Sequence, residues 1–200
     1  RICMYILGIV NHKVIANLYL ILGLGGLALG AIYSLFIRLE LGFPSMSMYM
    51  SWDAYNHAVT VHGIVRIFGF VMPVLFSAYV NMFLPLTLGT AEVAYCRLNN
   101  VSLIIYIIAL FYLIMVIMCE NVIGVGWTFY PPLSTVNSFL MAHSVVLMLL
   151  ALVVMGFSTT FSAINFMATV LIRMVGLLRS EMGPYVATAN ATSLLLFLVL

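Results

Sequence analysis

The feature that most limits what this chain can fold into is the near absence of charge along its apolar stretches. Only 6% of the 200 residues are charged, whereas 66% are hydrophobic. Soluble domains carry roughly 25% charged residues and roughly 45–50% apolar residues. A chain with this composition cannot cover a water-facing surface, so it is predicted to be an integral membrane protein. Its net charge of +2 gives no reason to expect a nucleic-acid partner.

Five apolar segments are candidates for membrane spans. A bilayer core of roughly 30 Å needs about 20 apolar residues per helix. The segments cover about 14–37, 54–86, 101–118, 139–172 and 186–200. The predicted fold is therefore an all-α, polytopic transmembrane helix bundle that forms a single membrane domain over residues 1–200. The last segment rises only ~22 Å, so either it is completed elsewhere, or the chain is one piece of a larger protein, or the bilayer thins around it.

The distribution of basic residues predicts an orientation. With five spans, one side of the membrane carries Arg1, Lys13, Arg97, Arg173 and Arg179. The opposite side carries Arg38. Because Lys and Arg concentrate in cytoplasmic or matrix loops, the N-terminus is predicted to lie on that side.

Two ionisable residues lie inside the second predicted span. His62 is about eight residues into it, ~12 Å below its start, and Arg66 follows one helical turn later on the same face. A neutral histidine at that depth either bonds to a neighbouring helix or ligates a metal or haem iron. Arg66 needs an anion or a cluster of carbonyl groups, and a transporter's substrate site would also suit it. For His57, nearer the interface, a solvated side chain is favoured.

Polar residues form a second pattern. Asn81, Glu92 and Asn99 surround the loop after the second span, and Ser158, Thr159 and Asn165 lie within the fourth. Hydrogen bonding between helices and a water-filled proton path both fit this pattern, and spacing alone leaves the choice open. Trp127 belongs to an aromatic, proline-containing loop that suits the membrane interface or a wall against a buried ligand.

A collinear series of short strings runs through these spans. They include Asn11-His12-Lys13, Ile37-Arg38-Leu39-Glu40-Leu41-Gly42, Val59-Thr60-Val61-His62, Val71-Met72-Pro73, Arg97-Leu98-Asn99-Asn100-Val101-Ser102 and Gly126-Trp127-Thr128-Phe129-Tyr130-Pro131-Pro132. In order and spacing the chain resembles subunit I of the haem–copper terminal oxidases, most closely the N-terminal part of the cytochrome c oxidase subunit. The resemblance covers Asn11 to about Met174.

The resemblance implies a haem site. His62 falls on the family's first axial ligand to the low-spin haem, which would be haem a, and Arg38 on the arginine that contacts a substituent of that ring. Tyr55 and Trp127 fall near the propionates. Glu40 falls where mitochondrial members hold a structural cation, so Ca, Na or Mg is expected there. Arg66 departs from the family, which has an apolar residue at this position.

The resemblance also implies a proton-uptake path. Its entrance would be Glu92, where the family usually has aspartate; the longer side chain keeps the acid function. The other matching polar residues are Tyr19, Asn81, Asn99, Ser102, Ser158, Thr159 and Asn165.

Family members have about twelve spans in this subunit, and the remaining ligands lie beyond the fifth. The chain is therefore expected to be the N-terminal portion of a split or larger subunit I. A second haem and copper would be bound by the rest. Expected partners are the remaining part of the subunit, a copper-bearing subunit II, cytochrome c and the lipid membrane. The mitochondrial inner membrane is the expected location, with a bacterial plasma membrane as the alternative.

The implied function is electron transfer from cytochrome c to dioxygen coupled to proton pumping. A quinol oxidase of the same superfamily is the nearest alternative. A transporter that binds an anion through His62 and Arg66, without haem, is a remote one. An accessory subunit without haem is a third, although His62 and Arg38 would then be costly in lipid without a use.

Overall fold

A computed structural model describes residues 11–43, 52–118, 123–134 and 142–173, and all structural statements below concern these ranges. Within them the regular secondary structure is entirely helical. Four helices are long and apolar enough to cross a membrane: His12–Gly42, Trp52–Thr87, Cys96–Met118 and Ser144–Ile172. This confirms the predicted all-α fold with transmembrane helices.

The helices overlap four of the predicted segments and extend past most of their ends. Helix α2 (His12–Gly42) begins directly after Asn11, whose side chain accepts a hydrogen bond from the Lys13 amide at 2.9 Å. Helix α5 (Cys96–Met118) includes a polar first turn that hydropathy alone leaves out of the span. Helix α6 covers Ala142–Arg173. The predicted segment 186–200 and residues 139–141 lie outside the described residues.

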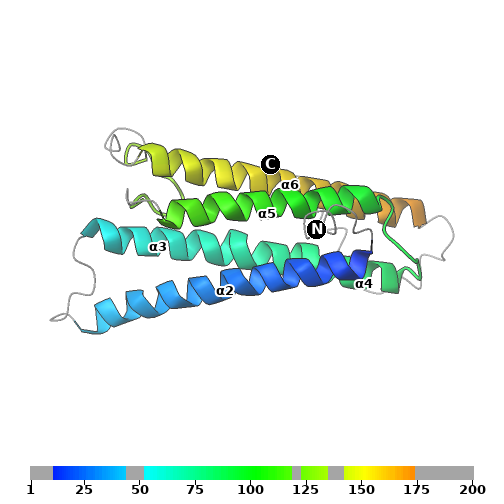
Figure 1. Cartoon of the computed structure of the whole chain (residues 1–200), viewed down its shortest axis with the longest axis horizontal. Coiled ribbons are helices and arrows are strands. Elements are labelled where there is room, and N and C mark those ends of the chain that lie inside the picture. The colour runs from blue at the N-terminus through cyan, green and yellow to red at the C-terminus, as the bar shows by residue number, and fades with distance from the viewer. Residues whose placement is uncertain (1–10, 44–51, 119–122, 135–141, 174–200) are drawn as a thin grey trace, which may run out of the picture.

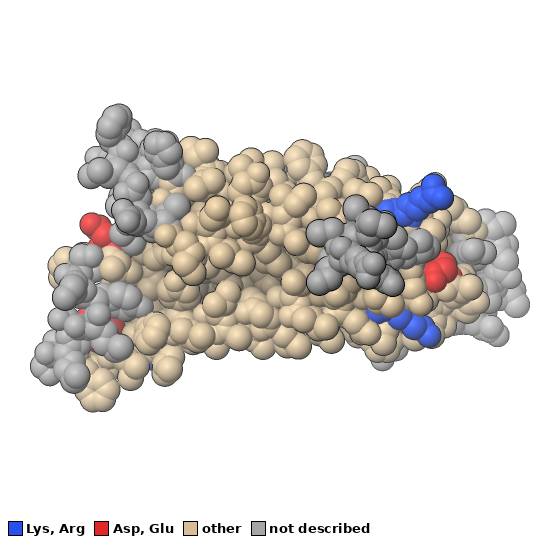
Figure 2. Space-filling model, viewed as in Figure 1, with Lys and Arg blue, Asp and Glu red and all other residues tan. Residues whose placement is uncertain are grey.

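The helices form an elongated bundle (Figure 1). Helix α2 lies along α3 (Trp52–Arg66) and its continuation, and α5 lies along α6. On the face shown in Figure 2, Lys, Arg, Asp and Glu side chains sit at the two ends, and a broad band without them separates the ends. That distribution suits a bundle whose middle lies in lipid.

The second membrane helix changes geometry half-way along. After α3 come two π-helical segments, η1 (Ile67–Val71) and η2 (Pro73–Tyr79), followed by α4 (Val80–Thr87). Pro73 has no N–H and its ring crowds the carbonyl four residues earlier, that of Gly69. The Tyr106 hydroxyl of α5 donates to this carbonyl at 3.0 Å. A neighbouring helix therefore satisfies the backbone group that the proline frees, as an apolar environment requires.

Glycines on α2 allow a close approach to this helix. A Cβ atom added to Gly26 would lie 2.5 Å from the carbonyl oxygen of Gly69, and one added to Gly23 would meet a methyl group of Val74. Gly25, on another face, has nothing within 4 Å. The buried glycines of α2 thus mark the contact with η1 and η2, in the small-residue manner of membrane helices.

Candidate functional site

His62 is held in one tautomer by the neighbouring helix. Its Nδ1 lies 2.8 Å from the backbone carbonyl oxygen of Gly30 on α2. A carbonyl oxygen can only accept, so Nδ1 carries the hydrogen and Nε2 of the neutral ring carries the lone pair. Ligating histidines in proteins are commonly oriented by such a bond from their other nitrogen. The ring is half-buried, and its Nε2 is the nitrogen that could ligate a metal.

A loop packs against the helix on both sides of this histidine. The indole of Trp127 sits over Gly63, where an added Cβ would lie 3.3 Å from the Trp127 Cβ. The Gly126 amide donates to the hydroxyl of Thr60 at 2.9 Å. Both anchors flank His62 in the sequence, so the loop is fixed at its level along α3.

His57 differs from the solvated side chain favoured by the sequence. The amide of Ile123 donates to its Nδ1 at 3.1 Å, which makes Nδ1 an acceptor. His57 thus has the opposite tautomer to His62 and serves as an anchor for the loop. Tyr55, partly buried, lies two turns before His62 on the same helix.

Arg38 and Glu40 lie near the end of α2. Arg38 is exposed and follows Gly30 by roughly 12 Å of helix. Glu40 is partly exposed. Within the described residues no group of three or more His, Cys, Asp or Glu side chains could together hold a metal ion. A cation at Glu40 would need backbone oxygens as well, and it remains a prediction.

Arg66 is packed across α2. Its Cγ and Cδ atoms would lie 2.9 Å from a Cβ on Gly30, so this glycine makes room for the arginine stem. Its buried Nε has no hydrogen-bond partner among the described residues. Gly30 therefore serves two side chains: its carbonyl orients His62, and its missing Cβ admits Arg66.

Five of the residues predicted for proton uptake form one hydrogen-bonded group, which we call the polar thread: Asn81, Asn99, Ser102, Tyr19 and Ser158. The Asn99 amide donates to Asn81 Oδ1 at 2.7 Å, and the Ser102 hydroxyl donates to the Asn99 carbonyl at 2.7 Å. The Tyr19 hydroxyl donates to Ser102 Oγ at 3.1 Å and lies 3.4 Å from Ser158 Oγ. All five are buried, so the thread passes through the protein interior.

A cavity of about 140 Å³ lies at one end of this thread. Tyr19, Ser77, Ser158 and Thr159 supply its polar lining. A cavity needs roughly 10–15 Å³ per water and several polar partners to be hydrated. This one meets both conditions and has space for several water molecules. Thr159, whose hydroxyl donates to the Gly156 carbonyl, joins the site through this cavity.

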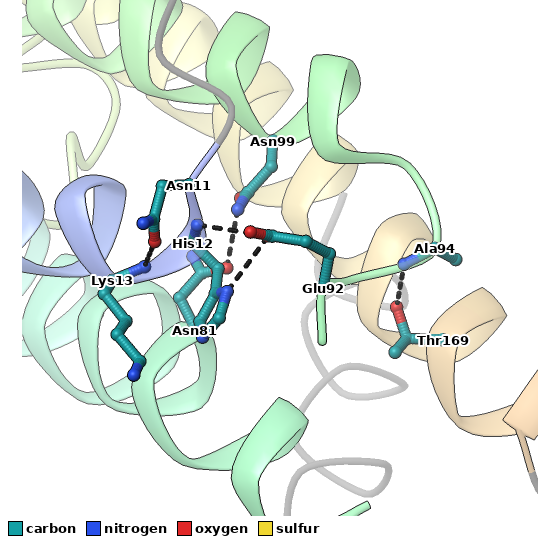
Figure 3. Close-up of polar contacts among 8 residues, drawn as sticks. All are labelled: Asn11, His12, Lys13, Asn81, Glu92, Ala94, Asn99 and Thr169. Carbon is teal, nitrogen blue, oxygen red and sulfur yellow. Dashed lines mark hydrogen bonds and ion pairs between the residues drawn. The ribbon is translucent and has the colours of Figure 1, made fainter. Parts of the chain in front are cut away.

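Glu92 lies at the other end, beside His12, to which the sequence pattern assigned no role (Figure 3). Its Oε2 is 3.0 Å from Nδ1 of His12 and 3.3 Å from the His12 backbone N. His12 is buried, and its Nε2 has no partner among the described residues. His12 belongs to the string Asn11-His12-Lys13, but its contact with Glu92 could not be predicted because the two residues are 80 positions apart.

Asn165 lies on the same face of α6 as Ser158, as its spacing predicts, but it contacts a loop. Its side-chain oxygen accepts from the Tyr95 amide at 2.9 Å, and Thr169 Oγ accepts from the Ala94 amide at 2.9 Å. These bonds tie the loop that carries Glu92 to α6; the Thr169 bond is drawn in Figure 3. Asn165 therefore positions the loop and stands apart from the polar thread.

Comparison with known proteins identifies the family of this chain. The family model described as "Cytochrome C and Quinol oxidase polypeptide I" matches residues 14–200. The chain belongs to this family. Cytochrome c oxidase subunit 1 of Candida albicans is 38% identical over 95% of the chain and 36% of its own length. The subunit of Mytilus edulis is 36% identical over 94% of the chain and 34% of its own length.

The Plasmodium berghei subunit is 35% identical over 95% of the chain and 40% of its own length. The chain thus spans about a third to two fifths of the length of these three relatives. Family membership and the four apolar helices make it a multi-pass membrane protein.

Proposed function

We propose that this chain is the haem-binding N-terminal portion of the catalytic subunit of a terminal oxidase. The complete enzyme would pass electrons from cytochrome c to dioxygen and pump protons across the mitochondrial inner membrane. The N-terminus would lie on the matrix side. Copper-bearing subunit II and the rest of subunit I would be its partners, and the second haem and copper would be bound there.

The observation that carries the proposal is the hydrogen bond from His62 Nδ1 to the Gly30 carbonyl at 2.8 Å. It leaves Nε2 with its lone pair, as an axial ligand to low-spin haem iron requires. The haem, when bound, would supply one-electron transfer. Arg38, Tyr55 and Trp127 come from the same half of the bundle, toward the end where α2 stops, and would contact the ring substituent and the propionates.

The polar thread would conduct protons toward the oxygen-reducing centre. Glu92 would take up a proton at the end of the bundle that carries Lys13, with His12 holding its carboxylate. Asn81, Asn99, Ser102, Tyr19 and Ser158 would orient water between Glu92 and the cavity. The unpartnered Oδ1 of Asn99 and Oγ of Ser162 are buried acceptors that water molecules could satisfy.

A quinol oxidase is the second candidate because the matching family includes both types. The electron donor would then be a quinol in the membrane. An anion transporter is less well supported, because it gives no reason for the tautomer of His62 or for the family match.

Oxygen uptake by the purified complex that contains this chain tests the proposal. With reduced cytochrome c as donor, oxygen consumption and proton release from reconstituted vesicles are expected. Oxygen uptake with a quinol and none with reduced cytochrome c would favour the quinol oxidase. Absence of oxygen uptake with both donors in a complex that retains all its subunits would contradict terminal-oxidase function.

A further inference from the structure

Arg66 is a charged residue within a predicted span to which the proposed function assigns no task. It ends α3 within the 36-residue apolar helix Trp52–Thr87. At ~1.5 Å per residue, roughly 20 Å of helix or more separates it from either end. Its depth therefore places it inside the apolar core, where charged side chains are costly and pair with other groups.

The packing of its stem directs Arg66 across the neighbouring helix. Cγ, Cδ and Nε would lie within about 3 Å of a Cβ at Gly30, and that position is glycine. An arginine that reached for the nearest headgroups would extend along its own helix toward the interface. Because the stem lies against Gly30, the partner of the guanidinium group is expected at the level of His62 and Gly30.

The described acidic side chains lie elsewhere. Asp53 is in the first turn of the same helix, roughly 20 Å away along its axis. Glu40 follows Gly30 by roughly 15 Å of α2, and Glu92 pairs with His12 at the opposite end. The buried Nε has no partner among the described residues. The anion or oxygen that meets the guanidinium group thus comes from a bound group or from protein outside the described residues.

The two side chains that use Gly30 point to a common ligand. Positions 62 and 66 are one turn apart on one helix face, and the ring at 62 offers Nε2 for iron. A macrocycle ligated there would extend past the adjacent turn. We infer that Arg66 is a further haem-binding residue, whose guanidinium group donates to a carboxylate or carbonyl oxygen at the edge of the haem held by His62. This inference rests on the proposed function.

A cation at that edge stabilises the reduced haem, because reduction adds a negative charge. In purified complex, Arg66→Met should shift the ratio of reduced to oxidised low-spin haem about tenfold toward oxidised at a fixed potential. That is about 59 mV lower for one electron. Arg66→Lys keeps the charge and should shift the ratio less than threefold. Arg66→Gln, which keeps polarity alone, should resemble Arg66→Met.

A glycine pair on α2 supplies a matched control that leaves the charge in place. Gly30→Ala should displace the stem of Arg66 and lower the potential of the low-spin haem by part of the shift seen in Arg66→Met. It should also move the absorption band of that haem. Gly25→Ala, where a Cβ meets nothing within 4 Å, should change neither. These two variants keep the inference testable if Arg66→Met fails to assemble.

The outcomes separate this inference from the proposed function. If the Arg66 variants retain low-spin haem with an unchanged potential and band position, Arg66 pairs with a carboxylate of another protein segment and the inference is wrong, while His62 ligation stands. If the unmodified complex contains no haem, the proposed function and the inference both fail.

Discussion

The haem-side region and the polar thread differ in how most of their buried polar groups are paired. The haem-side region comprises His62, Arg66 and Gly30 with the loop 123–134. Within the part of the chain that the structure describes, Nδ1 of His62 is bonded to a backbone carbonyl and Nε of Arg66 has no partner. In the polar thread, Tyr19, Ser102 and Ser158 are buried and joined to one another or to backbone carbonyls at 2.7–3.4 Å. The haem-side region keeps side-chain nitrogen atoms available for an added group, and the polar thread holds a line of hydrogen bonds.

This difference suits the two tasks that we propose for these regions. An axial ligand must be fixed in orientation and still keep one atom free, which a single bond to a backbone carbonyl achieves. A proton path needs ordered hydroxyl and amide groups next to space for water. Under the proposed function a cofactor would complete the haem-side region, whereas the hydrogen bonds of the polar thread form within the described residues. Variants in one region should therefore leave the signature of the other unchanged.

The largest separation is expected from Glu92→Gln. The amide cannot take up a proton, so oxidase turnover should fall at least tenfold, in line with the roughly 10²–10⁴-fold effect of removing a proton-transfer group. The low-spin haem spectrum should not change. Turnover measured with spectra of the same sample checks both. Glu92→Asp should retain most activity, and Asp53→Asn, at the opposite end, all of it. A changed haem spectrum would show that the two regions are coupled.

Gly26→Ala should loosen the contact between α2 and η1, which both regions share. The new Cβ would lie 2.5 Å from the Gly69 carbonyl oxygen, and backbone cannot move aside cheaply. Overpacking of this kind costs about 1–3 kcal/mol. Thermal unfolding of the purified complex should show a lower midpoint for Gly26→Ala and an unchanged one for Gly25→Ala. Equal midpoints for the two variants would contradict the close packing.

A comparable loss is expected for Tyr106→Phe. It leaves the Gly69 carbonyl, freed by Pro73, without its donor in an apolar setting. An unsatisfied buried group costs about 1–3 kcal/mol, to be measured by thermal unfolding against Tyr112→Phe on the same helix. The haem spectrum should stay as it was. If the tyrosine pair behaves alike, the π-helical segments do not depend on Tyr106.

Tyr19→Phe should have the smallest effect. It removes one hydrogen bond of about 0.5–1.5 kcal/mol, while the hydroxyls of Ser102 and Ser158 keep their bonds to backbone carbonyls. Turnover is expected to fall a few-fold. A loss as large as that of Glu92→Gln would mean that the Tyr19 hydroxyl itself carries the proton, and water does not bypass it.

The same sequence feature predicted the helices and singled out His62 as a candidate: a charge-poor apolar run identifies a span, and an ionisable residue within it is conspicuous. The helices are confirmed, and the role of His62 as a haem ligand stays a prediction. Pairings between distant residues could not be read in this way. His12 and Glu92 are 80 residues apart, and Asn165 shares a helix face with Ser158 but meets the loop backbone. In the sequence Gly30 is one of several glycines in the first span, and only its contacts with His62 and Arg66 distinguish it.

The central claim is that His62 is an axial haem ligand, and a reduced-minus-oxidised spectrum of the purified complex carrying His62→Ala tests it most directly. His57→Ala is the matched control, because it removes a histidine from the same helix that anchors a loop. The low-spin haem a band should be lost or become high-spin in His62→Ala and should persist in His57→Ala. An unchanged low-spin spectrum in His62→Ala would contradict the claim.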